Sequence, residues 1–417
     1  MKKTLLYAQS GGVTAVINAT AAAVIRAARE DARIGQVLAA RNGILGALDE
    51  DLIDTAVLSP EALVQLAHTP GGAFGSCRFD LDDPARNPAQ YDRLFDVFAA
   101  HQVGFFLYNG GNGSMDVITR LSAEARRRAY PLVCVGVPKT IDNDLMHTDF
   151  SPGFGSAAKY VATSMLEAGL DLQAMASRVG RAFVLEVMGR NAGWVAAATA
   201  LAGRDDREPP HLVLMPEVLL DEQALLQRVE AIVSRHGFCA ITVSEGIRNL
   251  KGEAVMEQSR DSKGHVQLGG AGQCITRMIT RHFGFKSHWA IPDYLQRSAG
   301  HLVSATDHTL AGAVGQAAVR FALDGLDGMM VSIRRLSDRP YRWQLEPVPC
   351  ASVGNLERTL PAEFIREDGF HVTDRARAFL QPLVEGEVPP PFSGGLPVYL
   401  RFSFTSLPRR LPVLQTD

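Results

Sequence analysis

Short apolar runs alternate along the chain with longer stretches in which apolar residues recur at helical spacing. The apolar runs predict strands at residues 4–8, 36–40, 103–108, 132–137, 182–187, 211–215 and 238–244. The amphipathic stretches predict helices at residues 14–29, 88–101, 114–128, 156–177 and 221–236. This alternation indicates βαβ units, with mainly parallel sheets covered by helices on both faces.

The chain has 417 residues, which is too long for one average domain. We expect an α/β fold with two Rossmann-like three-layer domains, an active site in the cleft between them, and a C-terminal extension. The first domain is predicted at residues 1–153 with about 296–350, the second at 154–295 and the extension at 351–417. The extension includes Pro389-Pro390-Pro391, which prevents a regular helix there and favours an ordered wrap.

Composition excludes several classes of protein. The net charge of −3 provides no basic field for nucleic acid or an anionic membrane. No apolar run approaches the roughly 18 residues of a membrane span, and the N-terminal apolar run is too short for a signal peptide. The five cysteines are scattered without a C-x-x-C pair, so neither a zinc site nor a disulfide framework is indicated. A soluble cytoplasmic protein is expected.

Candidate chemistry is concentrated in the segment Pro138-Lys139-Thr140-Ile141-Asp142-Asn143-Asp144, at the end of a predicted strand. Near a polyphosphate, its carboxylates can supply a general base and a partner for a hydrated divalent cation, while its lysine can meet phosphoryl oxygens. These groups are the requirements of phosphoryl transfer. Taken alone, the segment is better explained as a solvated turn after a strand.

Glycine-rich turns elsewhere in the chain favour the catalytic interpretation of this segment over a solvated turn. Residues 10–12 and 109–114 each follow a predicted strand and precede a predicted helix, and a third turn spans residues 71–76. Glycines let backbone amides approach phosphate oxygens, and a helix N-terminus adds positive dipole. Each turn is weak evidence, because glycine commonly punctuates structure. Two of them before one pair of carboxylates indicate a polyphosphate site.

Four further residues suit a sugar phosphate. Arg190 follows the strand predicted at 182–187, Glu245 follows the strand at 238–244, and Tyr294 and Arg297 lie further along. A guanidinium can bind a phosphate and a carboxylate can accept hydrogen bonds from sugar hydroxyls. The alternatives are a surface salt bridge for Arg190, helix capping for Glu245 and bracing of an interdomain surface for Tyr294 and Arg297.

Together these residues resemble the phosphofructokinase family, over nearly the whole chain to about residue 310. Their order and spacing are highly specific. The matching motifs are Ser10-Gly11-Gly12, Gly75-Ser76-Cys77-Arg78-Phe79, Gly110-Gly111-Asn112-Gly113-Ser114, Thr140-Ile141-Asp142-Asn143-Asp144, Met188-Gly189-Arg190, Ser244-Glu245-Gly246 and Gln296-Arg297.

The resemblance implies Mg²⁺-dependent phosphoryl transfer to the 1-hydroxyl of fructose 6-phosphate, a step of glycolysis and gluconeogenesis. Asp142 would be the general base, with Lys139 and Arg190 as further catalytic residues. Asn112 and Asp144 would position the metal. The donor would meet Gly12, Arg78, Gly113, Ser114 and Lys139. The sugar phosphate would meet Thr140, Ile141, Asp142, Arg181, Met188, Gly189, Arg190, Glu245, Tyr294, Leu295, Gln296 and Arg297.

Arg181 matches an arginine that family members contribute from a neighbouring subunit, so the resemblance also implies a homodimer or homotetramer. Two departures from the family pattern affect the site. Asn112 stands where an aspartate near the metal is common, so the charge at that position is lost. His288, with Lys286 nearby, stands where an intersubunit arginine would bind the sugar phosphate.

Two positions give opposite indications of the phosphoryl donor. The pyrophosphate-dependent branch of the family typically has an acidic residue where this chain has Gly113, which leaves room for ATP. That branch also has a lysine where the ATP-dependent branch has glycine, and here Lys139 is present. A glycine only permits ATP, whereas an ammonium attracts a compact, highly charged donor. Tyr294 and the turn after Gly12 also match the pyrophosphate branch, so pyrophosphate is predicted.

The alternatives to this prediction are an ATP-dependent enzyme, a catalytically silent regulatory subunit and a non-catalytic sensor. NAD and lipid kinases share a similar glycine turn, but they lack the combination of the motifs at Asp142 and Arg190.

Overall fold

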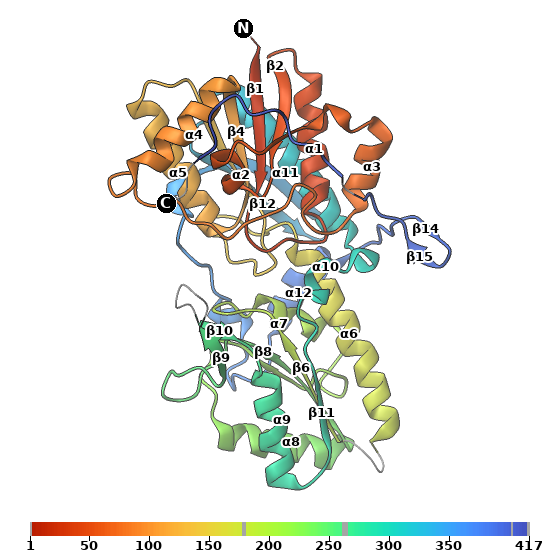
Figure 1. Cartoon of the computed structure of the whole chain (residues 1–417). Helices are drawn as coiled ribbons and strands as arrows, with labels where there is room; N and C mark the ends of the chain where they lie inside the picture. The colour runs from red at the N-terminus through yellow and green to blue at the C-terminus, as the bar shows by residue number, and fades with distance from the viewer. Residues whose placement is uncertain (1, 177–180, 261–265, 402, 415–417) are drawn as a thin grey trace.

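The computed structural model describes residues 2–176, 181–260, 266–401 and 403–414. The described chain forms two lobes, each built around one sheet (Figure 1). The larger sheet has strand order β13-β12-β5-β4-β1-β2-β3, and the smaller one has β11-β6-β8-β7.

The larger sheet is buried on both faces. Its strands are β1 (Lys3–Gln9), β2 (Ile34–Ala40), β3 (Leu52–Asp54), β4 (Val103–Gly110), β5 (Val133–Pro138), β12 (Met329–Asp338) and β13 (Tyr341–Pro349). The central strands run parallel, while β3 and β13 are antiparallel edges. Successive residues of β1 enter different cores: Leu5 and Tyr7 one, Leu6 and Ala8 the other. This explains why the strands are continuous apolar runs.

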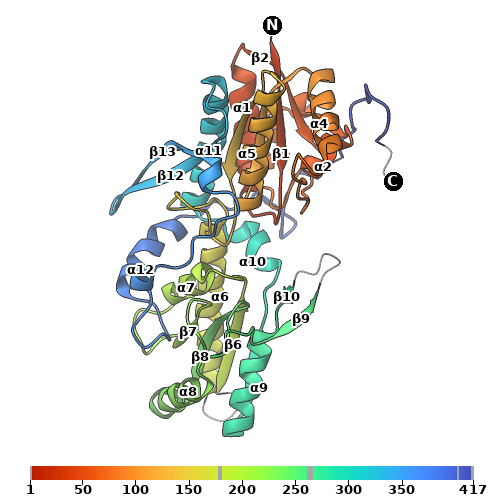
Figure 2. The same ribbon diagram turned by 90° about the vertical axis from the view of Figure 1, so that its left-hand side faces the viewer.

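Helices cover both faces of this sheet. One core includes residues of α1 (Ile17–Glu30) and α11 (Ala305–Leu323), and the other includes residues of α4 (Pro88–Ala100) and α5 (Asn112–Arg127). The two sets therefore lie on opposite faces of the sheet, and α11 and α4 appear on opposite sides of β1 in Figure 2. The lobe also contains α2 (Ile44–Leu48), η1 (Thr55–Val57) and α3 (Pro60–His68).

The smaller sheet is entirely parallel and consists of β11 (Ser287–Ala290), β6 (Ala182–Val187), β8 (Cys239–Ser244) and β7 (Leu212–Leu214). Its helices are α6 (Phe154–Met175), α7 (Trp194–Ala198), α8 (Glu222–His236) and α9 (Ala271–Phe283). The remaining elements are η2 (Thr199–Leu201), a hairpin of β9 (Glu257–Arg260) and β10 (Val266–Leu268), α10 (Leu295–Ser298) and η3 (Gly300–Leu302).

The C-terminal part of the chain contacts both lobes. After η4 (Cys350–Ser352) it crosses to the second lobe, where Phe364 and Phe379 pack against Trp194. It then returns, and the Leu407 amide donates to the Leu52 carbonyl at 2.7 Å. Its elements are η5 (Ala362–Phe364), α12 (Asp374–Leu380), η6 (Gln381–Val384), β14 (Phe392–Ser393) and β15 (Leu396–Pro397).

The predicted α/β architecture with two lobes and mainly parallel sheets is confirmed. All seven predicted strands and all five predicted helices are present, with boundaries within a few residues of those expected. The helix predicted from residue 14 begins at Ile17, because Thr14 and Val16 form a turn in which the Thr14 hydroxyl accepts from the Val16 amide at 3.3 Å. The helix predicted to reach 177 is described to Met175, and residue 177 lies outside the described residues.

The domain boundaries stay a prediction. They are supported by sheet membership, since strands of the larger sheet come from residues 3–138 and 329–349 and those of the smaller from 182–290. Among the described helices, none combines the length and apolar character needed to cross a membrane.

Candidate active site

The loops that carry the predicted site face each other between the lobes. They follow β1, β4 and β5 in the first lobe and β6 and β8 in the second. The carboxyl ends of parallel strands share one edge of a sheet, which is where ligands bind in open α/β folds. Met188, which follows β6, is tied to α10: its amide donates to the Gln296 side-chain oxygen at 3.1 Å. Gln296 is itself buried.

Three cationic side chains surround the turn after β1. The Lys139 ammonium donates to the Gly12 carbonyl at 2.7 Å, and only 4% of Lys139 is exposed. A Cβ atom added to Gly12 would lie 2.7 Å from a guanidinium nitrogen of Arg297 and 3.8 Å from one of Arg78. Gly11 has φ +70°, a conformation that side chains rarely adopt. The turn therefore presents bare backbone to a concentrated positive charge.

Burial shifts the protonation of Lys139. Desolvation, together with the charges of Arg78 and Arg297, lowers the pKa of Lys139 to about 8, while the charges of Asp142 and Asp144 oppose the change. In the free protein, the Lys139 ammonium therefore loses its proton at a lower pH than an exposed lysine does. A bound polyphosphate would favour the charged form, because opposite charge raises the pKa of an ammonium.

The glycine turn at the start of α5 is open. Apart from its sequence neighbours and the backbone of its own helix, no atom of the described residues lies within 4 Å of a Cβ built on Gly113. The Asn112 side-chain oxygen accepts from the Gly113 amide at 2.8 Å, and its nitrogen donates to the Leu356 carbonyl at 3.3 Å. Ser114 is buried, and its amide donates to the Gly111 carbonyl at 3.0 Å. Asn112 therefore places a neutral amide, already hydrogen-bonded to Gly113 and Leu356, at the position where an aspartate near the metal is common in the family.

The two carboxylates lie on a tightly tied loop. The Thr140 amide donates to the Pro152 carbonyl at 3.3 Å, and the Asp142 amide donates to the Thr140 hydroxyl at 3.1 Å. Asn143 has φ +52°, and its side-chain oxygen accepts from the Ser151 amide at 3.0 Å. Asparagine tolerates this left-handed conformation better than most residues, so the loop can turn between its two aspartates.

Both aspartates have raised pKa values. Burial raises the pKa of Asp142, and the Glu245 charge adds to this effect, while Lys139 and Arg78 oppose it. Burial and the charge of Asp142 raise the pKa of Asp144 to about 7. One oxygen of Asp144 is buried and has no hydrogen-bond partner within the described part of the chain. An acid with a pKa raised towards neutrality suits proton transfer near neutral pH.

The second lobe brings its predicted residues to the same region. Gly189 has φ +145°, and a Cβ there would lie 2.7 Å from both the Ala192 carbonyl oxygen and the Ser244 hydroxyl. Only glycine fits this approach. The Glu245 amide donates to the Val187 carbonyl at 3.0 Å, and burial raises the pKa of the Glu245 carboxyl while Arg190 opposes the shift. Ile141 is buried behind the loop.

Tyr294 and Arg297 lie beside the donor turn. The Arg297 guanidinium stacks 4.3 Å from the Tyr294 ring centroid, a cation–π contact. The Tyr294 and Leu295 side chains are 64% and 61% exposed. The sequence predicts that Arg297 binds the sugar phosphate. Because its guanidinium also lies close to Gly12, it can contribute to binding the phosphoryl donor as well.

Arg181 is not brought to the site of its own chain. It is exposed and immediately precedes β6, at the opposite end of the strand from Met188. The Arg181 amide donates to the Lys286 carbonyl at 3.0 Å, and exposed His288 follows on β11. These three basic residues therefore share the far edge of the smaller sheet.

Sequence reasoning missed a segment of the C-terminal extension. The Asn191 side chain donates to the Glu357 carboxylate at 2.7 Å, and Arg358 donates to the Asn143 carbonyl at 2.8 Å. Glu357 also contributes to raising the pKa of Asp142 and of Asp144. A turn that includes Gly354 and Asn355 directly precedes these residues, but nothing in the local sequence relates that turn to the site loops.

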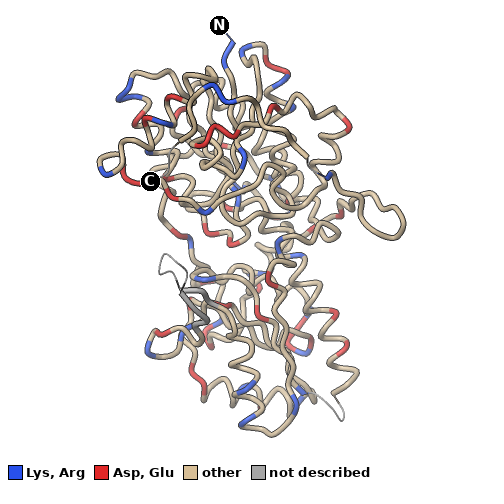
Figure 3. Tube along the Cα trace, viewed as in Figure 1, with Lys and Arg blue, Asp and Glu red and all other residues tan. Residues whose placement is uncertain are grey.

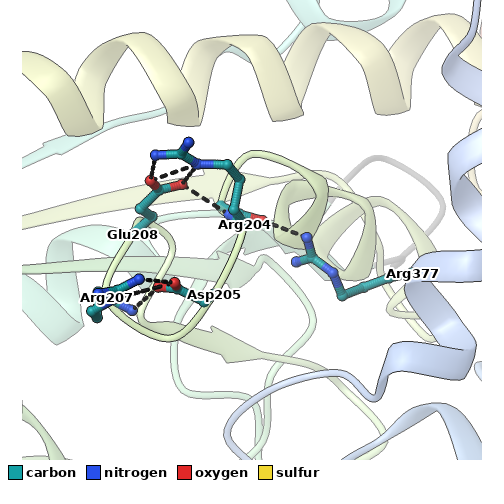
Figure 4. Close-up of polar contacts among 6 residues, drawn as sticks. Arg204, Asp205, Arg207, Glu208 and Arg377 are labelled. Carbon is teal, nitrogen blue, oxygen red and sulfur yellow. Dashed lines mark hydrogen bonds and ion pairs between the residues drawn. The ribbon is translucent and has the colours of Figure 1, made fainter.

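A second polar region does not compete as the site. A cavity of about 630 Å³ is lined by arginines of the second lobe and of the C-terminal extension, and three of them are drawn with their partners in Figure 4. Arg207 pairs with Asp205 at 2.6 Å, Arg204 pairs with Glu208, and Arg377 donates to backbone carbonyls. Acidic and basic residues are mixed along both lobes in the view of Figure 3, which fits this local pairing.

The fold and the strand-end loops define a class of two-lobed phosphoryl-transfer proteins, and sequence comparison identifies the family. Residues 4–322 match the family described as phosphofructokinase. The chain is 52% identical over 408 residues to the pyrophosphate–fructose 6-phosphate 1-phosphotransferase of Halomonas elongata, covering 97% of each protein. It is 51% identical over 411 residues to the protein of the same name from Xanthomonas campestris, covering 98% of each.

A solved structure agrees with these matches. The pyrophosphate-dependent phosphofructokinase of Nitrosospira multiformis superimposes with a TM-score of 0.92 at 45% identity, over 99% of this chain and 100% of the other. The chain belongs to the phosphofructokinase family.

Proposed function

We propose that this protein transfers a phosphoryl group reversibly from pyrophosphate to the 1-hydroxyl of fructose 6-phosphate, giving fructose 1,6-bisphosphate and phosphate. The observation that carries the proposal is the buried Lys139 ammonium at the Gly12 turn, with Arg78 and Arg297 beside it. Such a compact cationic site matches a small, highly charged donor. The two relatives that are 52% and 51% identical to this chain are named for this reaction.

Each named residue then has a role that its surroundings support. Asp142 takes the proton from the sugar hydroxyl, which its raised pKa favours. Lys139 and Arg78 stabilise charge on the transferring phosphoryl group and on the phosphate that leaves. Glu245 and Arg190 orient the sugar and its phosphate, and the backbone of Gly189 permits close approach.

Enzymes of the phosphofructokinase family generally use Mg²⁺. One buried oxygen of Asp144 has no hydrogen-bond partner among the described residues, and it suits this ion because Mg²⁺ prefers oxygen ligands. Within the described residues, no group of three or more acidic, histidine or cysteine side chains could hold a metal. Mg²⁺ is commonly held by one or two carboxylates with water and substrate phosphates, and the ion there would neutralise charge on the phosphates.

The donor is tested by comparing pyrophosphate and ATP in one assay with fructose 6-phosphate and Mg²⁺. Pyrophosphate should give the far higher kcat/KM, and fructose 1,6-bisphosphate with orthophosphate should support the reverse reaction. A higher kcat/KM with ATP would assign the chain to the ATP-dependent alternative. Absence of turnover with both donors would favour a silent regulatory subunit.

The arrangement at the far edge of the smaller sheet supports a homo-oligomer that shares site residues. Arg181, Lys286 and His288 are exposed there, away from the site of their own chain. Large apolar side chains are also exposed on β11 and on α6, including Trp289 (42%) and Leu170 (60%). Exposed apolar side chains and a strand at the edge of a sheet are both typical of interfaces.

Subunit complementation tests this sharing. Arg181→Ala and Asp142→Asn chains should each be nearly inactive. When the two variants are unfolded and refolded together, a symmetric dimer should recover roughly a quarter of wild-type activity, because hybrids contain one intact site. Sedimentation gives the oligomeric state directly. A monomer, or a mixture without recovery, would contradict the shared site.

A further inference from the structure

Residues 356–358 of the C-terminal extension contact three separate loops of the candidate site. The Leu356 carbonyl accepts from Asn112 at 3.3 Å, on the glycine turn. The Glu357 carboxylate accepts from Asn191 at 2.7 Å, just after Arg190. Arg358 reaches the loop that holds Asp142 and Asp144. This segment touches both lobes at the point where the site loops converge.

Arg358 makes the most contacts of the three. Its guanidinium donates to the Asn143 carbonyl at 3.2 and 2.8 Å and to the Asp149 carbonyl at 3.3 Å. Its backbone amide donates to the Asp144 carbonyl at 2.7 Å. On its other side, its carbonyl accepts from the Trp194 indole at 3.1 Å, and its guanidinium lies 4.6 Å from a Trp194 ring centroid.

These contacts fix the Asp142 loop at several points. Asn143 lies between the two aspartates in a left-handed conformation, so its carbonyl orientation is coupled to the placement of both carboxylates. A planar guanidinium can serve the carbonyls of Asn143 and Asp149 together while its face packs on an indole. The single-point ammonium of lysine cannot reproduce this geometry. Trp194 belongs to the second lobe, so Arg358 also fixes the loop relative to that lobe.

We propose that Arg358 is a positioning residue for the phosphoryl-transfer reaction, and that residues 356–358 hold the Asp142 loop in register with the second lobe. Arg358 acts through the backbone of residues 143–149. A misplacement of about 1 Å can cost about 100-fold in rate even when the altered residue is far from the chemistry. The inference rests on the proposed function for its kinetic test.

The test compares Arg358→Met and Arg358→Lys with a matched control, Arg366→Met. Arg366 is also an arginine of the extension that donates to a backbone carbonyl, that of Val372 at 3.0 Å, but it does not bridge to the site loops. We expect kcat to fall about 10- to 100-fold in both Arg358 variants, with KM for both substrates within about threefold. Arg366→Met should retain the wild-type kcat.

Two readouts separate positioning from general stability. Millimolar guanidinium should partly restore kcat in Arg358→Ala, whereas neutral urea at the same concentration should not. Hydrogen exchange should become faster at residues 140–151 in Arg358→Met, with β4 unchanged and no such change in Arg366→Met. If Arg358→Met fails to fold, Arg358→Lys carries the same comparison.

The inference is overturned if folded Arg358 variants keep kcat within about threefold of wild type or show unchanged exchange at residues 140–151. A failure of the proposed function would be a different result from a failure of this inference. If the wild-type protein does not turn over pyrophosphate, the kinetic arm is void, while the exchange comparison still decides whether Arg358 fixes the loop.

Discussion

The ammonium of Lys139 donates a hydrogen bond to the carbonyl of Gly12 at 2.7 Å. Lys139 follows β5 and Gly12 follows β1, and β4 lies between these two strands in the sheet. The hydrogen bond thereby connects the loop after β5 with the turn after β1. In the free protein this buried cation is satisfied largely by a backbone carbonyl. A phosphate group entering the turn would offer a stronger, charged acceptor. The relationship makes Lys139 the natural place to test donor recognition.

Replacing Lys139 with methionine should lower kcat/KM for pyrophosphate by about 10- to 200-fold, the effect of losing one or two charge-assisted hydrogen bonds. Lys251→Met, at an exposed turn, is the control and should be unchanged. Lys139→Gly should additionally raise the ratio of ATP to pyrophosphate activity. Equal pyrophosphate kinetics in Lys139→Met and wild type would remove Lys139 from donor binding.

The pH dependence of pyrophosphate binding should report the same group. Burial lowers the pKa of Lys139 to about 8 in the free protein, so above that pH binding must be accompanied by uptake of a proton. The KM for pyrophosphate should therefore rise towards tenfold per pH unit above about 8. Lys139→Arg keeps its charge and experiences the same titration of pyrophosphate, so its KM should rise less steeply. Parallel profiles for the two proteins would contradict the assignment.

Asp142→Asn should lower kcat by roughly 10²–10⁴-fold while changing KM little, because a positioned base acts mainly in the transition state. The amide is nearly isosteric and removes the charge without emptying the site. Single-turnover measurements of fructose 1,6-bisphosphate formation would isolate the chemical step. A nearly normal single-turnover rate would exclude Asp142 as the base.

The buried aspartates should also reduce stability near neutral pH. Burial and Asp142 raise the pKa of Asp144 to about 7 from an ordinary value near 3.8, so between those values the folded state binds more protons than the unfolded state. Stability must then fall as pH rises across that interval. Asp144→Asn should raise Tm by a few degrees at pH 8 and by much less at pH 4.5, measured without Mg²⁺. A stabilisation independent of pH would contradict the raised pKa.

Much of this architecture could be predicted from the sequence because its strands are buried on both faces. Such strands are continuous apolar runs, as in β4, and their ends are marked by glycine or charge. The hairpin of β12 and β13 was not predicted. Its outer part, from Arg334 onward, alternates exposed and half-buried residues, so only the short apolar stretch from Met329 to Ile333 marks it in the sequence.

The candidate site was predictable only where its chemistry is local. Lys139 and Asp142 share a loop with a recognisable pattern, and the glycine at 189 is required by a close backbone approach. Arg358 reaches the site from more than 200 positions away along the chain. That contact is created by the path of the extension between the lobes, which neither periodicity nor motif spacing encodes.

Gly113 offers a test of donor exclusion that leaves the fold intact. Beyond its sequence neighbours and its own helix backbone, the described part of the chain places no atom within 4 Å of a Cβ at this position, which lies in the first turn of α5. Gly113→Asp should therefore be tolerated, with a gain of about 0.3–1 kcal/mol in stability from placing negative charge at a helix N-terminus. Its carboxylate would occupy space and add charge where the α-phosphate of a nucleotide must pass.

We therefore expect Gly113→Asp to abolish any measurable ATP-dependent activity while pyrophosphate kcat/KM stays within about tenfold of wild type. Gly113→Asn is the matched control, because it fills the same space without charge and should reduce ATP use less. Isothermal titration with a non-hydrolysable ATP analogue would measure exclusion apart from turnover. If Gly113→Asp bound the analogue as well as wild type does, the open turn would not be the path of a nucleotide, and Lys139 alone would set the choice of donor.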